Sequence, residues 1–295
     1  MHPGARVVHH MAALDGANPP NSLEAVRACL EAGATTIEID AAALAGDDFL
    51  VVHDLDLASE TTGRGLALEC SLAQARDLRI KARDGTVPGC RVPLLSEVIA
   101  LLLDYPGTRL QVDLKDERPY ENEEPIIRLA QLALPAEGRV IVSSMADWQL
   151  RRLRKFAPWL EVGFDPGFYL AWWPPAYVDP SLPPHRMGAY GYLDDQPLAD
   201  ERVWPPERYL AERADVLLRM VPGITTFYVY HGLLAKSLDD GFNWADACRD
   251  AGVTLDAWTM DIGRPGMEER VRRLDEAGVE LFTTNTPREL AALLV

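Results

Sequence analysis

The sequence has few cysteines, and their spacing matches no familiar cysteine site. The 295-residue chain has four cysteines, and no two of them form a C-x-x-C pair; they are Cys29, Cys70, Cys90 and Cys248. Zinc sites and disulfide frameworks need clustered or regularly spaced cysteines. We therefore expect neither of them, and interpret these residues as buried or idle thiols.

Long apolar segments are also missing. No apolar run approaches the roughly 20 residues that a membrane-spanning helix needs, and the N-terminus has no apolar run of signal-peptide length. We therefore expect no stable membrane insertion and a cytoplasmic location.

Positive charge is scarce as well. The chain carries 29 Lys and Arg against 45 Asp and Glu, a formal net charge of -16. An acidic surface repels the phosphates of nucleic acids and of anionic lipids. Nucleic acid is therefore not an expected partner. A small anionic substrate is still compatible with this composition, because a bound metal ion can reverse the field around a site.

What the chain does have is an alternation of strand and helix patterns. Helical patterns follow Ser22 and span 94–105, 123–133, 146–157, 239–251 and 266–277. Between them lie eight candidate strands, at 6–9, 36–41, 109–115, 139–143, 160–164, 224–230, 253–258 and 279–284. This alternation is typical of a parallel sheet covered by helices. Eight strands favour a closed (β/α)8 TIM barrel, formed by a single domain over 1–295. An open doubly wound sheet is the alternative, but no glycine-rich fingerprint supports it.

Two segments interrupt this alternation. Residues 49–53 follow strand 36–41 too closely for a crossover helix, so they are interpreted as the returning arm of a hairpin, followed by a small excursion over 54–93. Residues 165–206 form a long insertion rich in Pro, Trp and Tyr. The insertion leaves the carboxyl end of a strand, where barrel active sites lie. It is interpreted either as a lid or substrate-binding wall, or as a packing or oligomer contact.

Acidic residues collect at the ends of two predicted strands. Glu38 and Asp40 alternate with apolar isoleucines, so both carboxylates share one face of their strand. Asp113 lies on the polar face of strand 109–115, together with Lys115. Three inward carboxylates favour a divalent cation with oxygen ligands, Mg²⁺ or Ca²⁺, and Lys115 would supply a point charge for a phosphate.

Histidines near strand ends are candidates for proton transfer. His53 ends the hairpin arm, and His9 and His10 end the first strand. Only one of these two neighbours can point inward from a regular strand. We expect it to be His9, in the register that also turns Val7 inward. His231 follows strand 224–230 and is a further candidate for lining the site.

These motifs resemble those of the glycerophosphodiester phosphodiesterases, within the metal-dependent phospholipase-C-like barrels. That family has a first strand ending in H-R, then E-N-T, E-[IL]-D, V-V-H-D with T-T-x-G, E-I-K, W-T-x-N and T-[DN]-x-P. The corresponding segments here are H-H at 9–10, P-N-S at 20–22, E-I-D at 38–40, V-V-H-D at 51–54, T-T-G at 61–63, D-L-K at 113–115, W-T-M-D at 258–261 and T-N-T-P at 284–287. The resemblance runs nearly end to end.

The resemblance implies roles for particular residues. Glu38, Asp40 and Asp113 would hold the metal, His9 and His53 would be the acid-base pair, Lys115 would lie near the phosphate, and Trp258 would line the pocket. With His9 in that role, His10 stands where the family has an arginine; with His10 in that role, Met11 does. Two further departures are Pro20 in place of a Glu and Asp113 in place of a Glu.

The implied reaction is metal-dependent hydrolysis of a small-molecule glycerophosphodiester to an alcohol and a phosphomonoester. Two alternatives stay open. One is a lipid phosphodiesterase of the lysophospholipase-D or sphingomyelinase-D type, with the aromatic insertion holding the acyl chain. The other is a non-catalytic barrel that binds a phosphorylated ligand; the missing arginine and Pro20 favour it, and the three acids, Lys115 and His53 argue against it.

Overall fold

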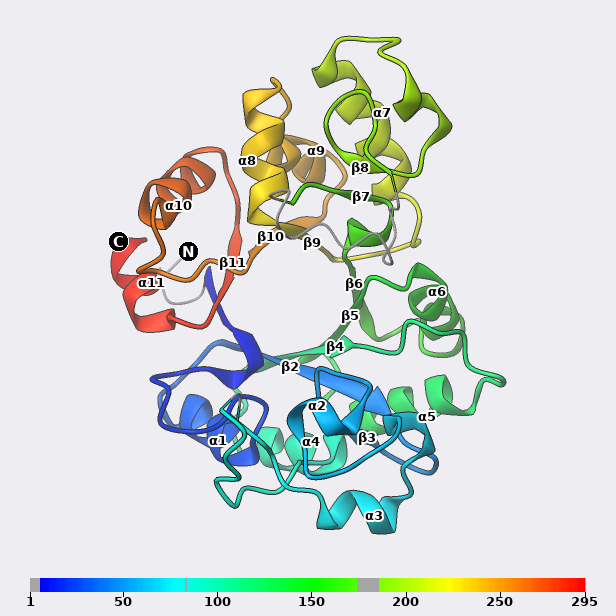
Figure 1. Cartoon of the computed structure of the whole chain (residues 1–295), viewed down its shortest axis with the longest axis vertical. Coiled ribbons are helices and arrows are strands. Elements are labelled where there is room, and N and C mark those ends of the chain that lie inside the picture. The colour runs from blue at the N-terminus through cyan, green and yellow to red at the C-terminus, as the bar shows by residue number, and fades with distance from the viewer. Residues whose placement is uncertain (1–5, 83, 174–185, 295) are drawn as a thin grey trace.

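The structure is a computed structural model that describes residues 6–82, 84–173 and 186–294. Within these residues, eight parallel strands close into a barrel, because β1 pairs with both β2 and β11 (Figure 1). The strands are β1 (Val7–His9), β2 (Thr36–Ala43), β4 (Arg109–Leu114), β5 (Val140–Ser144), β6 (Glu161–Phe164), β9 (Thr226–Tyr230), β10 (Thr254–Trp258) and β11 (Leu281–Thr284). The predicted barrel is confirmed, and each predicted strand coincides with one of these to within a few residues.

Helices surround the barrel on its outer side (Figure 1). They are α1 (Leu23–Glu31), α4 (Leu95–Leu103), α5 (Glu124–Ala133), α6 (Asp147–Phe156), α7 (Pro206–Leu218), α8 (His231–Asp239), α9 (Trp244–Asp250), α10 (Met267–Glu276) and α11 (Pro287–Leu293), with a 3₁₀ turn η4 (Leu134–Ala136) after α5. The main core lies between the strands and these helices; Ile37 and Ile39 are fully buried in it. The alternating pattern of β2 therefore sends its isoleucines outward to the helices and its acids inward.

The helix predicted over 239–251 is shorter in the structure, where only its later part forms a helix, α9. α8 ends at Asp239 and α9 begins at Trp244, and Gly241 between them has a φ of 86°. Glycine adopts this left-handed conformation at little cost, so it allows the chain to turn there. The helices α7, α8 and α11 were not predicted from the sequence pattern.

A small substructure follows β2. β3 (Phe49–Leu50) runs antiparallel to the end of β2, as expected of a hairpin arm. The excursion after it contains α2 (Leu57–Glu60), the turn η3 (Ala67–Glu69) and α3 (Leu72–Asp77). It has its own apolar cluster, which includes Leu50, Leu57 and Val92. This substructure fixes the backbone on either side of His53.

The insertion after β6 is attached by buried polar contacts. Its elements are η5 (Pro166–Phe168), β7 (Leu170–Ala171), β8 (Leu193–Asp194) and η7 (Pro197–Asp200). Asp194 is buried, accepts a hydrogen bond from the Tyr209 hydroxyl at 2.7 Å and pairs with Arg213 at 3.1 Å. The part of the predicted insertion at 174–185 lies outside the described residues. None of the described helices has the length and apolar character needed to cross a membrane.

Candidate active site

The two acids of β2 and the acid of β4 lie together at the barrel mouth. The register of the sheet places Asp40 beside Asp113 and Glu38 beside Gln111. Each of the three acids, Glu38, Asp40 and Asp113, offers a carboxylate oxygen within 4.8 Å of those of the other two. Glu38 and Asp40 are buried, and Asp113 is partly exposed. The three-acid cluster predicted from the strand pattern is therefore present.

Lys115 is the cation inside this cluster. Its Nζ lies 2.9 Å from Asp40 Oδ1 and 2.5 Å from Asp113 Oδ2. Burial works to raise the pKa of Asp40, but Lys115 and His53 hold that pKa below its usual value. The pKa of Glu38 is raised well above its usual value by burial and by the charges of Asp40 and Asp113. One ammonium group is thus too little positive charge for three close carboxylates.

The donor set fits a divalent cation. Three carboxylates that crowd one another are stabilised when a cation with a preference for oxygen lies between them. Their orientation is fixed from behind: the Met11 N–H donates to Glu38 at 2.6 Å, the Asn21 amide to Asp40 at 2.8 Å and the Ser143 hydroxyl to Asp113 at 2.7 Å. Such outer contacts are a usual feature of metal sites. Asn21 belongs to the P-N-S segment; its contact with Asp40 was not predicted.

Of the two neighbouring histidines, His10 lines the cavity and His9 does not. His9 packs on the outer side of β1, where its Nδ1 lies 2.8 Å from the Ala13 carbonyl oxygen and 3.6 Å from Cys29 Sγ. Burial lowers the pKa of His9. The expectation that Val7 and His9 turn inward is wrong, because β1 has the opposite register: Val7 belongs to the core outside the barrel.

His10 reaches the cavity from a turn rather than from a strand. It begins η2 (His10–Ala12), in which Met11 and Ala12 have φ values of 49° and 56°. Its Nδ1 lies 2.9 Å from Asn285 Oδ1. The Asn285 side-chain amide in turn donates to both oxygens of Asp261, at 3.1 and 3.2 Å. Asn285 and Asp261 come from the late T-N-T-P and W-T-M-D segments. These two segments therefore support the side chain of His10, although they lie at the other end of the chain.

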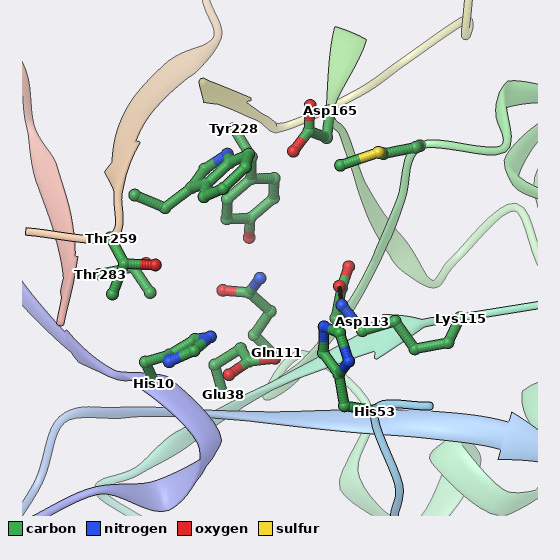
Figure 2. Close-up of a pocket in the computed structure, with 12 residues that line it drawn as sticks. His10, Glu38, His53, Gln111, Asp113, Lys115, Asp165, Tyr228, Thr259 and Thr283 are labelled. Atoms are coloured by element: carbon green, nitrogen blue, oxygen red, sulfur yellow. Dashed lines mark hydrogen bonds and ion pairs between the residues drawn. The ribbon is translucent and has the colours of Figure 1, made fainter. Parts of the chain in front are cut away.

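His53 approaches the same cavity from the hairpin arm. Figure 2 shows His10 and His53 on either side of Glu38, with Asp113 and Lys115 next to His53. The Nδ1 of His53 lies 2.9 Å from Asp54 Oδ1, and half of the His53 side chain is exposed. One histidine therefore has an amide partner and the other a carboxylate partner.

The cavity has a volume of about 260 Å³ and extends beyond the acids. Trp258 lines it, as predicted from the resemblance. His231 does not: it is buried, its Nδ1 contacts Arg270 at 2.9 Å, and burial together with Arg270 lowers its pKa to about 4. The lining also includes residues that the sequence analysis did not name as site residues, Gln111, Met145, Asp165, Tyr228, Thr259 and Thr283. Asp165 could have been found, because it directly follows a predicted strand.

Comparisons with known proteins agree with this geometry. A sequence model of the glycerophosphoryl diester phosphodiesterase family matches residues 13–167. A glycerophosphodiester phosphodiesterase of Caldanaerobacter subterraneus is 24% identical over 278 residues, 94% of this chain and 92% of that protein. A glycerophosphodiester phosphodiesterase of Parabacteroides distasonis superposes with a TM-score of 0.65 at 18% identity, over 98% of this chain and 96% of that one.

A phosphodiesterase of Oleispira antarctica, in complex with its product sn-glycerol-3-phosphate, superposes with a TM-score of 0.64 at 17% identity, over 98% of this chain and 96% of that one. At these identities the structural likeness establishes the fold. The family model covers more than half of the chain, and on that ground the chain belongs to the glycerophosphoryl diester phosphodiesterase family. It is a phosphoric diester hydrolase.

Proposed function

We propose that the protein hydrolyses a glycerophosphodiester in a metal-dependent reaction, with His10 and His53 as its acid-base pair. The observation that carries this proposal is the arrangement in Figure 2, in which two imidazoles from different segments flank a three-acid cluster in one cavity. Water attack on the phosphorus and release of an alkoxide require one group that accepts a proton and another that donates one.

The metal would be held by Glu38, Asp40 and Asp113, with Mg²⁺ and Ca²⁺ as the candidates. When bound, a divalent cation neutralises charge that develops on the phosphate oxygens. Lys115 would add a second positive charge from the same side. Among the described residues that line the cavity, it is the only lysine or arginine. Because Met11 stands after His10, where the family has an arginine, Lys115 would carry the side-chain charge on the phosphate alone.

His10 suits the role of general base. The Asn285 amide is oriented by Asp261, so its oxygen faces His10 Nδ1. An oxygen acceptor at that position holds the proton on Nδ1 and leaves Nε2 with a lone pair. His10 Nε2 would then take the proton from the attacking water as the new P–O bond forms.

His53 suits the role of general acid. Its Nδ1 lies 2.9 Å from a carboxylate oxygen of Asp54, an acceptor that holds a proton on Nδ1, fixes the ring and leaves Nε2 for proton transfer. The imidazolium would give its Nε2 proton to the leaving alkoxide as the old P–O bond breaks. Proton transfer from His10 back through solvent to His53 restores both residues, so atoms and charge balance over one turnover.

The substrate class rests on the relatives. The curated relative at 24% identity is a glycerophosphodiester phosphodiesterase, and the Oleispira antarctica structure holds sn-glycerol-3-phosphate as product. A volume of about 260 Å³ suits a small phosphate ester such as glycerol phosphate, with the second alcohol directed toward solvent.

A second candidate is hydrolysis of a lysophospholipid to its acyl-bearing phosphate and a free head group. Three aromatic rings favour it: Trp173 of the insertion lies 4.2 Å from Tyr230 and 5.9 Å from Trp258, as measured between ring centroids. Such a cluster beside the cavity would offer apolar surface to an acyl chain.

One assay tests both candidates. The purified full chain is stripped of metal, reloaded from a panel of Mg²⁺, Ca²⁺, Mn²⁺ and Zn²⁺, and given glycerophosphocholine, glycerophosphoethanolamine, a lysophosphatidylcholine and bis(p-nitrophenyl) phosphate. We expect metal-dependent release of choline or ethanolamine from the two glycerophosphodiesters. Faster turnover of the lysophospholipid would favour the second candidate. Binding of these compounds with no hydrolysis under any metal would contradict both candidates and favour a non-catalytic barrel.

A further inference from the structure

One carboxyl group in the cavity has no part in the proposed reaction. Asp165 follows β6, and it lies across the cavity from His10 and His53 (Figure 2). Asp165 is only 9% exposed, yet it belongs to the cavity lining. It is not a member of the three-acid cluster.

The local backbone holds Asp165 in this orientation. The Asp165 N–H donates to the Ser144 carbonyl at 3.1 Å, and Oδ1 accepts from the Gly167 N–H at 2.8 Å. A Cβ added at Gly167 would come within 3.1 Å of Asp165 Oδ1 and 3.2 Å of Met145. The turn is therefore packed closely behind the carboxyl group, which keeps it directed at the cavity rather than at solvent.

The surroundings of Asp165 are apolar and aromatic. Met145 packs behind its turn, and Tyr228 and Trp258 also line the cavity. Burial raises the pKa of Asp165 to about 8, with the nearby charge of Asp113 acting in the same direction. The remaining lone pairs of the carboxyl group can accept hydrogen bonds from ligand hydroxyls, and the neutral acid that burial favours can also donate one.

We infer that Asp165, with the Trp258 ring beside it, forms a subsite for the hydroxyl groups of a polyol esterified to the phosphate. The inference rests on the proposed function, because it takes the phosphate to lie against the three acids. A buried polar group on an apolar wall orients a small ligand when it forms hydrogen bonds with it. A site built in this way discriminates against an analogue that lacks the hydroxyls, since the part of its carboxyl group that is not bonded to Gly167 is then left without that partner.

A quaternary ammonium head group is the competing occupant of an aromatic wall. A cation on this wall would need a free carboxylate, but Asp165 Oδ1 already accepts from the Gly167 N–H at 2.8 Å, and a hydroxyl needs only one remaining lone pair. We therefore include phosphocholine as the competing probe.

Equilibrium binding to the metal-loaded full chain tests this assignment without relying on turnover. The probes are sn-glycerol 3-phosphate, n-propyl phosphate, which lacks both hydroxyls, and phosphocholine. We expect the wild-type protein to bind glycerol phosphate about tenfold more tightly than propyl phosphate. In Asp165→Ala the ratio of the Kd of propyl phosphate to the Kd of glycerol phosphate should fall to near one, with the Kd of propyl phosphate itself unchanged. Asp165→Asn keeps the oxygen that accepts from Gly167 and can still hydrogen-bond a hydroxyl, so it should retain most of the preference.

Two controls separate a subsite from a purely structural role. Asp56→Ala removes a carboxyl group that caps α2 through the same type of contact, with the Ala58 N–H at 3.0 Å, but lies outside the cavity. It should leave all three Kd values unchanged. If Asp165→Ala weakens glycerol phosphate and propyl phosphate equally, Asp165 acts only on the turn, and the subsite is refuted. If it weakens phosphocholine most, the subsite takes a cation, and the polyol assignment is overturned.

Failure of the subsite and failure of the proposed function give different results. In one outcome, the wild-type protein hydrolyses glycerophosphodiesters, and Asp165→Ala leaves the preference for glycerol phosphate over propyl phosphate unchanged. This outcome supports the proposed function and refutes the subsite. In the other outcome, the wild-type protein hydrolyses none of the diesters, but Asp165→Ala abolishes the preference for glycerol phosphate in binding. This outcome supports the subsite and refutes the proposed function.

Discussion

The cavity has two unlike walls. The charged wall, formed by Glu38, Asp40, Asp113 and Lys115, comes from β2 and from β4 with the residue that follows it. The aromatic wall, formed by Met145, Asp165, Tyr228 and Trp258, comes from β9, β10 and the residues that follow β5 and β6. The family model ends at residue 167, so it includes the whole charged wall but not Tyr228 or Trp258. Attack on a phosphodiester requires the same fixed charges whatever alcohol it carries, whereas recognition of the alcohol depends on shape.

The largest effect should follow from removing a charge from the charged wall. Glu38→Gln keeps the shape and the contact with the Met11 N–H but offers no carboxylate to a cation. We expect kcat/KM to fall by about 10³-fold or more, with a matching loss of Mn²⁺ binding in a titration. Asp47→Asn changes an exposed acid paired with Arg128 and should have no effect. Full activity of Glu38→Gln in excess chelator would refute the metal site.

The two neighbouring histidines at the end of β1 and the start of η2 give the next test. His10→Ala should lower kcat by about 10²–10⁴-fold, because His10 lines the cavity. His9→Ala should lower the melting temperature, since His9 is buried against Ala13 and Cys29, but should leave kcat within a few fold. The opposite ranking of the two variants would restore His9 as the acid-base residue.

The two proton-transfer roles separate by the leaving group. A p-nitrophenolate leaves without protonation, whereas a choline or glycerol alkoxide does not. His53→Ala should therefore lose about 10²-fold more activity on alkyl diesters than on aryl diesters. His10→Ala should lose similar activity on both, because the attacking water needs a base in either case. Equal, mild losses in both variants would mean that the imidazoles only position the phosphate.

A smaller effect is expected from the aromatic cluster beside the aromatic wall. Trp173→Ala removes a ring that packs against Tyr230, with the ring centroids 4.2 Å apart. If the insertion contacts an acyl chain, KM should rise several-fold for long-chain lysophospholipids and stay constant for glycerophosphocholine. Leu198→Ala changes an exposed apolar residue of the insertion outside the cavity lining and serves as the control. A KM independent of chain length would leave Trp173 with a packing role.

The last effect concerns stability rather than activity. Asp256 is fully buried in the barrel, and burial raises its pKa from 3.8 to about 7. A carboxyl group with a raised folded-state pKa stabilises the fold below pH 4, and this contribution disappears as pH rises through 7. Asp256→Asn keeps an acceptor for the Thr283 hydroxyl and cannot ionise. It should therefore flatten the pH dependence between 4 and 7 and raise the free energy of unfolding at pH 8 by about 2–4 kcal/mol. Parallel profiles for the two proteins would contradict this.

The sequence alone predicted the barrel and the charged wall. Strand and helix periods are local properties, and the alternation in β2 decides which side chains face inward wherever the strand pairs. Glu38, Asp40, Asp113 and Lys115 were therefore found from the pattern. Their roles, like those of the histidines, stay predictions until the variants are measured, and so do the single-domain organisation and the cytoplasmic location.

The choice between His9 and His10 could not be made from the sequence. Val7 and Val8 are both apolar, so a strand of three residues gives no alternation from which to infer its inward face. His10 also lies in a turn, where the period of two no longer applies. Only the pairing of β1 with β2 and β11 set the register.

Apart from Trp258, which the resemblance had already implied as a pocket residue, the aromatic wall was decided by the tertiary structure. Met145, Asp165, Tyr228 and Trp258 are distant in the sequence, and they meet because the sheet closes and brings the ends of β5, β6, β9 and β10 to one mouth. Burial of Asp165, which raises the pKa of its carboxyl group, is likewise a property of the closed barrel. The sequence by itself determined which strands carry charge inward, because that follows from a repeat of two residues. Which uncharged groups face those charges depends on contacts across the barrel, and only the fold supplies them.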